Sequence, residues 1–193
     1  VAILMAQKTG RPVKMWMTRE EVFRATGPAP GSHIRVKMGV TNDGDITAVD
    51  SDMWFEAGGY PGSAYGAGMQ ALIAPYDVDT FRIKGYDVLV NKPKSAAYRA
   101  PGAPNASHAT ESLIDELCEH IGMDPLEFRL RNAARKGTRQ ASGPAYPEIG
   151  MVETVEAAKE HEHYKTKLGP NQGRGVASGW WVNAGGEATA HIV

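Results

Sequence analysis

The stretch Ile34-Arg-Val-Lys-Met-Gly-Val40, with Asn42-Asp-Gly44 and residues 46–55 after it, decides the fold class. Apolar side chains occupy every second position of residues 34–40 and alternate with charged side chains or glycine, which is typical of a strand with one wet face. The sequence Asn-Asp-Gly supplies residues that accept the positive φ angles of a tight hairpin turn. We therefore predict that residues 46–55 return antiparallel to residues 34–40.

The strongest helical pattern follows residue 104, where apolar residues recur at spacings of three and four and acidic residues lie between them. The apolar positions are Ala106, Ala109, Leu113, Leu117 and Ile121, and the acidic positions are Glu111, Asp115, Glu116 and Glu119. Gly122 ends this helix. Asp124 and Pro125 predict a second helix, because they suit an N-cap and a first helical turn. Hairpin and helices together predict an α+β fold with an antiparallel sheet and packed helices.

Further elements are expected on both sides of this central part. Residues 1–6 form the end of an apolar helix capped by Gly10, and Thr18 with Glu21 forms the capping box of a short helix. The other expected elements are strands at 13–17, 81–90 and 175–182, a turn at 142–147 and a helix at 152–160. In this division residues 1–95 are mainly strands and glycine-rich loop, residues 96–170 are mainly helices, and residues 171–193 are a returning strand.

Composition and charge exclude several function classes. The 193 residues carry a formal net charge of −1 with both signs mixed along the chain, so no basic block offers a footprint for nucleic acid. Apolar runs stay far below the ~18 residues that a membrane span needs. The single cysteine, Cys118, excludes an internal disulfide and suits a reducing, cytoplasmic compartment. The incomplete helix at 1–6 and the strand cut at 190–193 predict a fragment of a larger subunit.

Three motifs have plainer explanations than the chemistry they suggest. Residues 66–71 match the dinucleotide fingerprint G-x-G-x-x-A, but they follow a loop, whereas that fingerprint requires a buried strand before it. His161 and His163 flank a helix end with no second ligand cluster nearby, which indicates a solvated helix end. Cys118 has the spacing of a helical packing position. The glycine-rich residues 57–68 are either a mobile loop or a place of close backbone approach.

The remaining candidate is Ala96-Ala-Tyr-Arg-Ala-Pro-Gly-Ala-Pro104, where a strand ends and a turn of small residues leads into the best helix. This order brings unpaired backbone amides, the positive end of a helix dipole and the guanidinium of Arg99 into one neighbourhood. Such a place suits an anionic cofactor. An ordinary strand-to-helix turn with Arg99 on the surface explains the same residues, and both interpretations stay open at this point.

Several landmarks in their order and spacing resemble the molybdopterin-binding subunits of molybdenum hydroxylases, the family of xanthine dehydrogenases, aldehyde oxidases, carbon monoxide dehydrogenases and N-heterocycle hydroxylases. The landmarks are Gly10-Arg-Pro-Val-Lys14, Thr18-Arg-Glu-Glu21, Ala97-Tyr-Arg-Ala-Pro-Gly-Ala-Pro104, Glu111-Ser-Leu-Ile-Asp-Glu116 and Asp124-Pro-Leu-Glu-Phe-Arg-Leu-Arg-Asn132. Because these landmarks extend through most of the chain, the match is more specific than any single motif. The resemblance implies a partial molybdopterin-binding domain.

The resemblance also implies a chemistry. A molybdenum–molybdopterin cofactor would hydroxylate an electron-poor carbon with oxygen from water, as a metal-bound hydroxyl attacks and hydride passes to sulfur. Electrons would leave through iron–sulfur clusters, commonly to a flavin such as FAD on a partner domain or subunit, within a higher oligomer. In the family, the segment matching Tyr98, Arg99 and Ala100 lines the molybdenum site. No residue of this chain matches the family's base glutamate or supplies a metal ligand, so the isolated chain is expected to bind no cofactor and to be inactive.

Two departures from the family pattern bear on substrate. Purine-hydroxylating members have an arginine near the position of Ala29 and an aromatic residue where Pro101 stands. Trp180 and Trp181 match a region where another family aromatic faces the substrate, and packing within a strand is the alternative role for both. An aldehyde, an N-heterocycle or a similar small carbon substrate is therefore expected. A non-catalytic scaffold or interaction module of the same ancestry is the alternative reading of the whole chain.

Overall fold

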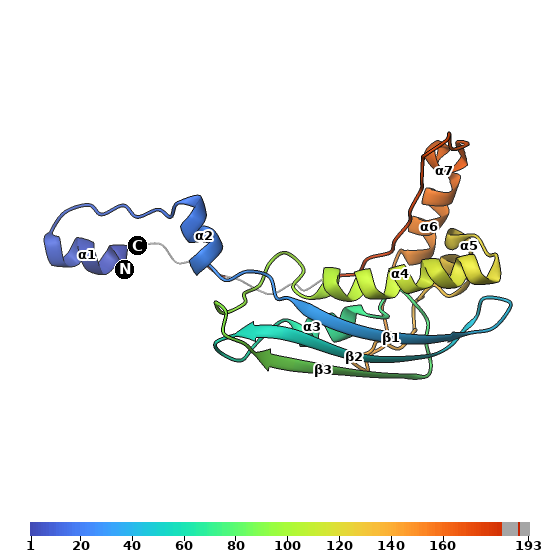
Figure 1. The fold of residues 1–193 in the computed structure, drawn as a ribbon, viewed down its shortest axis with the longest axis horizontal. Coiled ribbons are helices and arrows are strands. Elements are labelled where there is room, and N and C mark those ends of the chain that lie inside the picture. The colour runs from blue at the N-terminus through green and yellow to red at the C-terminus, as the bar shows by residue number, and fades with distance from the viewer. Residues whose placement is uncertain (183–188, 190–193) are drawn as a thin grey trace.

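A computed structural model describes residues 1–182 and residue 189, and Figure 1 shows its α+β architecture. The helices are α1 (Ala2–Thr9), α2 (Arg19–Ala25), α3 (Tyr65–Ala71), α4 (Ala103–Ile121), α5 (Pro125–Arg131), α6 (Met151–Glu160) and α7 (Glu162–Lys165). The strands are β1 (Ser32–Val40), β2 (Ile46–Gly58) and β3 (Phe81–Leu89). The predicted α+β class is confirmed.

The hairpin of β1 and β2 has the predicted antiparallel pairing, with Val36 opposite Ser51. Its turn needs one positive φ angle, at Gly44, where φ is 87°. The ladder shifts register at Gly39 and Val40, next to the turn. The alternation of apolar and polar residues thus predicts correctly which side chains face inward. The register is well specified, because a slip of one residue would turn every apolar side chain to the outer face.

The third strand corrects the prediction of an antiparallel sheet. β3 lies beside β2 and runs parallel to it, so the sheet is mixed, in the order β1-β2-β3. The chain leaves β2, crosses over through α3 and enters β3 in the same direction. A parallel neighbour needs such a crossover, and the sequence analysis did not identify the short helix that supplies it.

Helices α3 and α4 cover one face of the sheet and build the core with it (Figure 1). Buried residues of this core come from the inward face of β2, from α3 and the residues after it, and from α4 and α5; among them are Val49, Met53, Phe55, Leu72, Tyr76, Ala106, Ile114, Cys118 and Phe128. The opposite face of the sheet carries polar residues and the stacked rings of Trp54 and Tyr86. The sheet is therefore covered on one side only within the described residues.

The buried stripe of α4 differs from the predicted one. The predicted Ala109, Leu113 and Leu117 are only half-buried, and the buried positions are Ala103, Ala106, Thr110, Glu111, Ile114 and Cys118. Two polar residues lie on the buried side because each has a partner there. The Thr110 hydroxyl, for example, donates to the Leu72 carbonyl at 2.9 Å. The helix ends at Gly122, as predicted, in a left-handed conformation.

Two predicted strands are wrong as strands. Residues 13–17 and 175–182 have no strand partner in the described part of the chain. A period-two pattern predicts an extended backbone, but a strand also needs a neighbour to bond with. Residues 183–188 and 190–193, where the strand at 190–193 was expected, lie outside the described residues.

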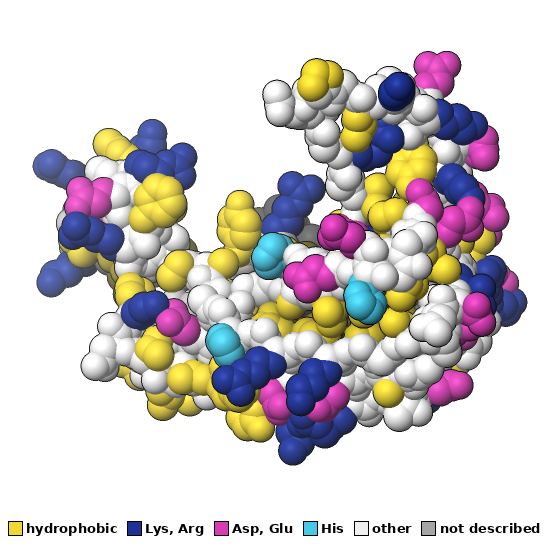
Figure 2. All heavy atoms as spheres, turned by 45° about the vertical axis from the view of Figure 1, so that its right-hand side comes forward, with side chains coloured by type: hydrophobic (Ala, Val, Ile, Leu, Met, Phe, Trp, Pro, Cys, Tyr) yellow, Lys and Arg dark blue, Asp and Glu magenta, His cyan; other side chains and the backbone are white. Residues whose placement is uncertain are grey.

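The first 26 residues form an arm that extends away from the sheet (Figure 1). Its helix ends are as predicted: Gly10 caps α1 in a left-handed conformation, and Thr18 with Glu21 forms the capping box of α2. Neither helix has a buried residue. Figure 2 shows hydrophobic and basic side chains together on this arm. Among the described residues, no helix combines the length and the apolar character of a membrane span.

Candidate functional site

The turn before α4 is held by close backbone approach. The Ser95 amide donates to the Ala57 carbonyl at 2.9 Å, and the Ala96 amide donates to the Pro28 carbonyl at 3.0 Å. Gly58 permits this contact, because a Cβ atom there would lie 2.2 Å from the Pro93 carbonyl oxygen. Of the two predictions for the glycine-rich residues 57–68, close backbone approach therefore describes this end of the stretch.

Ala100 holds an unusual backbone conformation in this turn. Its φ is 56°, in the left-handed region that disfavours every residue with a Cβ atom. Its carbonyl accepts from the Ala103 amide at 3.1 Å as α4 begins. Gly102, with φ 79°, faces the α3 start so closely that a Cβ atom would lie 2.4 Å from the Ala64 carbonyl oxygen. Strain of this kind is concentrated at functional sites.

An open groove of about 540 Å³ lies where the start of α4 meets the segment after Arg174. One wall comes from the turn and the first helical turns, and the other comes from residues 177–181. The lining residues are Ala100, Ala103, Pro104, Ser107, Ala177, Ser178, Gly179, Trp180 and Trp181. The structure thus brings the predicted Ala100, Trp180 and Trp181 together, although residues 100 and 180 are far apart in the sequence.

The other predicted site residues do not line the groove. Tyr98 is 72% exposed, Arg99 is exposed, and Pro101 is half-buried, and none of the three lines the groove. Ala29 is exposed and lies outside the lining as well. The cofactor-binding and substrate roles of these residues remain predictions.

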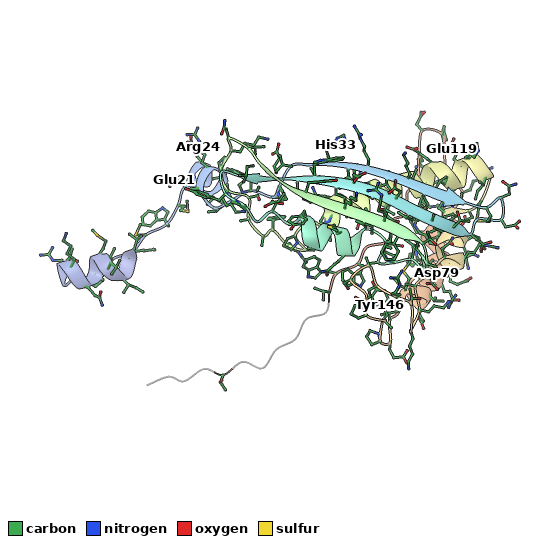
Figure 3. The ribbon with its side chains drawn as sticks, turned by 90° about the horizontal axis from the view of Figure 1, so that it is seen from below. Glu21, Arg24, His33, Asp79, Glu119 and Tyr146 are labelled. Carbon is green, nitrogen blue, oxygen red and sulfur yellow. The ribbon has the colours of Figure 1, made fainter. Side chains whose placement is uncertain are left out.

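Trp180 combines packing with its place in the groove. Its ring lies edge-on to Tyr146 with centroids 6.3 Å apart, and it packs against the hydrophobic core. Figure 3 labels Tyr146 on the helix-covered side of the sheet. Burial raises the pKa of Tyr146 to about 12. Trp181, 42% exposed, has the more open ring of the two tryptophans in the groove.

Behind the second wall lies a buried polar cluster that the sequence analysis missed. Glu111 accepts from Arg129 Nε at 3.0 Å and Nη2 at 2.8 Å, from the Tyr76 hydroxyl, and from the Ser178 amide at 2.6 Å. Burial, with the negative charge of Glu111 beside it, raises the pKa of Tyr76 well above its ordinary value. The apolar spacing placed Glu111 outside the predicted apolar stripe of α4, and no signal in the local sequence indicated its distant partners.

The plainer explanations of the weak motifs are supported. The glycines of residues 66–71 lie inside α3, where Gly68 packs so closely that a Cβ would meet the Phe55 ring at 2.9 Å. His161 caps α7 by accepting from the His163 amide. Burial raises the pKa of the Cys118 thiol to about 11, as suits a packing residue.

The charge of Arg99 in the turn before α4 suits an anionic group. Arg99 is exposed and precedes Ala100 of the groove lining, and no ion pair joins it to a carboxylate of the described residues. A guanidinium so placed suits an anion. Within residues 1–182 and residue 189, no cluster of three or more His, Cys, Asp or Glu side chains could hold a metal ion directly.

Known proteins resemble this chain in sequence and in fold. Residues 1–133 match the model of the molybdopterin cofactor-binding domain. The large molybdopterin subunit of nicotinate dehydrogenase from Eubacterium barkeri is 32% identical over 81% of this chain and 38% of its own length. An aldehyde oxidoreductase from Megalodesulfovibrio gigas is 32% identical over 90% of this chain and 20% of its own length.

A solved structure agrees with these sequence relatives. The aldehyde oxidoreductase from Desulfovibrio gigas superposes with a TM-score of 0.72 at 30% identity, over 81% of this chain and 18% of that one. The chain therefore spans well under half the length of the relatives it matches. It belongs to the molybdopterin cofactor-binding domain family, among the molybdopterin-binding subunits of xanthine dehydrogenases and aldehyde oxidases.

Proposed function

We propose that this chain is the central part of the catalytic subunit of a molybdenum-dependent hydroxylase. The observation that carries the proposal is the groove at the start of α4, where Ala100 of the strained turn lines the same space of about 540 Å³ as Trp180 and Trp181. The reaction is oxidative hydroxylation: a carbon–hydrogen bond is replaced by a carbon–oxygen bond with oxygen from water, and two electrons leave. When bound, the molybdenum–molybdopterin cofactor supplies this oxygen transfer and accepts the electrons.

The chain's own residues have binding and orienting roles in this proposal. Arg99 holds an anionic part of the cofactor through charge-assisted hydrogen bonds. Ala100 presents its backbone to the groove, and the left-handed conformation fixes the direction in which its amide and carbonyl point. Trp180 and Trp181 provide flat apolar surface on which an uncharged ring or chain can pack. Iron–sulfur and flavin domains or subunits of the same enzyme take the electrons onward.

The residue at position 29, which lies outside the groove lining, supports a small aldehyde or an N-heterocycle as substrate rather than a purine. A hydroxylated purine needs a hydrogen-bond donor for its exocyclic oxygen, and Ala29 offers none. Two arginines near Ala29 in the sequence could replace the missing donor, but both make other contacts in the structure. Arg24 pairs with Glu20 on the arm (Figure 3 labels Arg24 there), and Arg35 lies over the Trp54 ring. A site without the anchoring donor cannot favour the purine.

The experiment is a substrate panel with the enzyme that contains this chain. We expect kcat/KM for aliphatic and aromatic aldehydes or for pyridine-type rings to exceed that for xanthine and hypoxanthine. Loss of a hydrogen-bond anchor lowers kcat/KM by roughly 10⁴-fold in sites built around one, so the difference should be large. Ala29→Arg serves as the reciprocal variant, expected to gain purine turnover only if residue 29 faces the substrate. A kcat/KM for xanthine above that for every other compound would contradict the substrate assignment.

A further inference from the structure

The buried cluster behind the groove joins four parts of the chain. Glu111 and Asp115 come from α4, Arg129 from α5, Tyr76 from the connection between α3 and β3, and Ser178 from the groove wall. Arg129 is fully buried, and Glu111 is 5% exposed. Taking two charges out of water costs several kcal/mol for each ion, and their attraction repays this only with good geometry. The buried ion pair of Arg129 and Glu111 is therefore weak evidence for a role in stability alone, and a second role is expected.

The groove wall depends on this pair for its main-chain hydrogen bonds. Residues 175–182 have no regular secondary structure, and no backbone–backbone hydrogen bond within the described residues involves them. Among the described residues, two hydrogen bonds involve their backbone, and both go to the cluster. Arg129 Nη2 donates to the Val176 carbonyl at 2.9 Å, and the Ser178 amide donates to Glu111 Oε2 at 2.6 Å.

The two ties define where the tryptophans stand. They bind alternate residues, 176 and 178, as hydrogen bonds from a neighbouring strand would. Trp180 and Trp181 follow within three residues of Ser178, so the hydrogen bond at Ser178 acts together with the packing of Trp180 against Tyr146 to position this wall. Before the segment, Arg174 makes separate bonds to the Tyr164 and Thr166 carbonyls, so that the upstream end is fixed independently.

We infer that Glu111 and Arg129 are positioning residues of the proposed hydroxylase: through the backbone of Val176 and Ser178 they hold the Trp180–Trp181 wall of the groove, and so set which substrates fit. The effect on substrate choice rests on the proposed function, whereas the positioning of the wall does not. The side-chain pair takes the place of a strand partner, because buried charged donors and acceptors make stronger hydrogen bonds than neutral groups do. Neither residue is part of the lining of the groove, whereas Glu111 lines an adjoining hollow that shares Pro104, Ser107 and Ala177 with it.

The direct test removes one tie and leaves the charge pair intact. Ser178→Pro abolishes the amide that donates to Glu111, whereas Gly175→Pro is the matched control in the same segment. The Gly175 amide makes no hydrogen bond to a described residue, its φ is not positive, and a Cβ there would meet nothing within 4 Å. Both variants are made in the intact holoenzyme, with a fluorescent tryptophan analogue incorporated at position 181.

We expect Ser178→Pro to expose the analogue to acrylamide quenching and to raise KM for bulky aromatic aldehydes by roughly ten- to a hundredfold, with a smaller effect on acetaldehyde. Gly175→Pro should leave quenching and KM within a factor of about two. Molybdenum content should equal that of the wild type in both. Equal quenching and equal KM in the two variants would overturn the inference.

A second variant separates positioning from stability. Replacing the cluster by apolar groups of similar volume, in the combined variant Tyr76→Phe, Glu111→Leu, Arg129→Met, removes both ties without leaving a buried charge alone. We expect the melting temperature to stay close to that of the wild type while quenching at position 181 rises. A lowered melting temperature with unchanged quenching would mean that the pair serves stability only. Quenching needs no turnover, so an enzyme that hydroxylates no aldehyde or N-heterocycle would contradict the proposed function and leave the positioning result standing.

Discussion

Two neighbouring residues at the turn before α4 differ in how they serve the site. Arg99 is exposed, and in the proposed enzyme its contribution depends on the anionic group that it binds. Ala100 lines the groove directly and does so in a conformation that costs free energy in the folded protein. Substitution should separate the two contributions, because one acts on binding and the other on backbone strain.

We expect Arg99→Ala to lower molybdenum occupancy or kcat/KM of the intact enzyme by roughly ten- to a hundredfold, the value of a lost charge-assisted hydrogen bond. Arg99→Lys should recover part of the loss, since an ammonium keeps the charge but loses the planar fork. Metal analysis and steady-state kinetics check this, with Arg11→Ala on the arm as the control. Wild-type occupancy and turnover in Arg99→Ala would show that Arg99 is a surface residue without this role.

Ala100→Gly should raise the free energy of unfolding by about 0.5–1 kcal/mol. Glycine removes the cost of about 1–2 kcal/mol of a left-handed alanine in the folded protein. Part of this gain is offset, because glycine loses more conformational entropy than alanine on folding. Ala97→Gly is the matched control in the same turn, where φ is not positive and glycine should destabilise. Urea denaturation of both variants measures the difference. A loss of stability in Ala100→Gly as large as in Ala97→Gly would refute the assignment of strain.

Among the elements, the junction between the hairpin turn and α5 shows how the sheet and helices are joined. The Asn132 side chain accepts from the Ile46 amide at 2.9 Å and donates to the Gly44 carbonyl at 2.8 Å. Beside it, Arg131 forms a two-point ion pair with Asp45, with Nε–Oδ1 at 2.6 Å. The landmark residues at the end of α5 therefore hold the hairpin turn and lie away from the groove.

The ion pair at this junction gives a pH-dependent prediction. The hydrogen bond from Arg131 lowers the pKa of Asp45 below its ordinary value of 3.8. Ionised Asp45 thus stabilises the folded protein above that value, and the contribution is lost as the pH falls through the lowered pKa. We expect the melting temperature of the wild type to exceed that of Asp45→Asn at neutral pH. This difference in melting temperature should disappear as the pH falls below the ordinary pKa of the carboxyl group. A gap that persists at lower pH would contradict this, and Asp43→Asn is the control in the same turn.

At the scale of the whole molecule, the arm of residues 1–26 carries several large apolar side chains in exposed positions. Ile3, Leu4, Trp16 and Phe23 are each at least 68% exposed. Large apolar side chains gathered on an exposed surface mark a contact with another surface. In the proposed enzyme that contact is with other parts of the subunit or with its partners.

We expect the isolated 193-residue chain to self-associate through this surface and to carry no molybdenum. Sedimentation velocity over a range of concentrations and metal analysis test the two parts. The double variant Trp16→Ser, Phe23→Ser should shift the chain toward monomer, whereas Thr9→Ser on the same arm should not. A monomer whose melting temperature is independent of concentration would contradict the first part, and near-stoichiometric molybdenum would contradict the second.

The local elements of this protein could be predicted because their determinants lie within a few residues of one another. The Thr18–Glu21 box, the left-handed Gly10 and Gly122, the Asp124 cap and the alternation of β1 each depend on near neighbours. The family resemblance is local in the same sense, since its landmarks are short segments read in order. Of the candidate site, the turn at 98–101 could be found in this way.

Tertiary structure alone decided the parts that depend on distant partners. β3 is parallel because α3 carries the chain across the sheet, and residues 175–182 are no strand because side chains, and not a neighbouring strand, bind their backbone. Glu111 is buried because Arg129 and Tyr76 reach it from other elements. A charge is buried at low cost only when oppositely charged or hydrogen-bonding partners surround it. A helical pattern predicts which face of the helix a residue lies on, but not which residues of other elements contact that face.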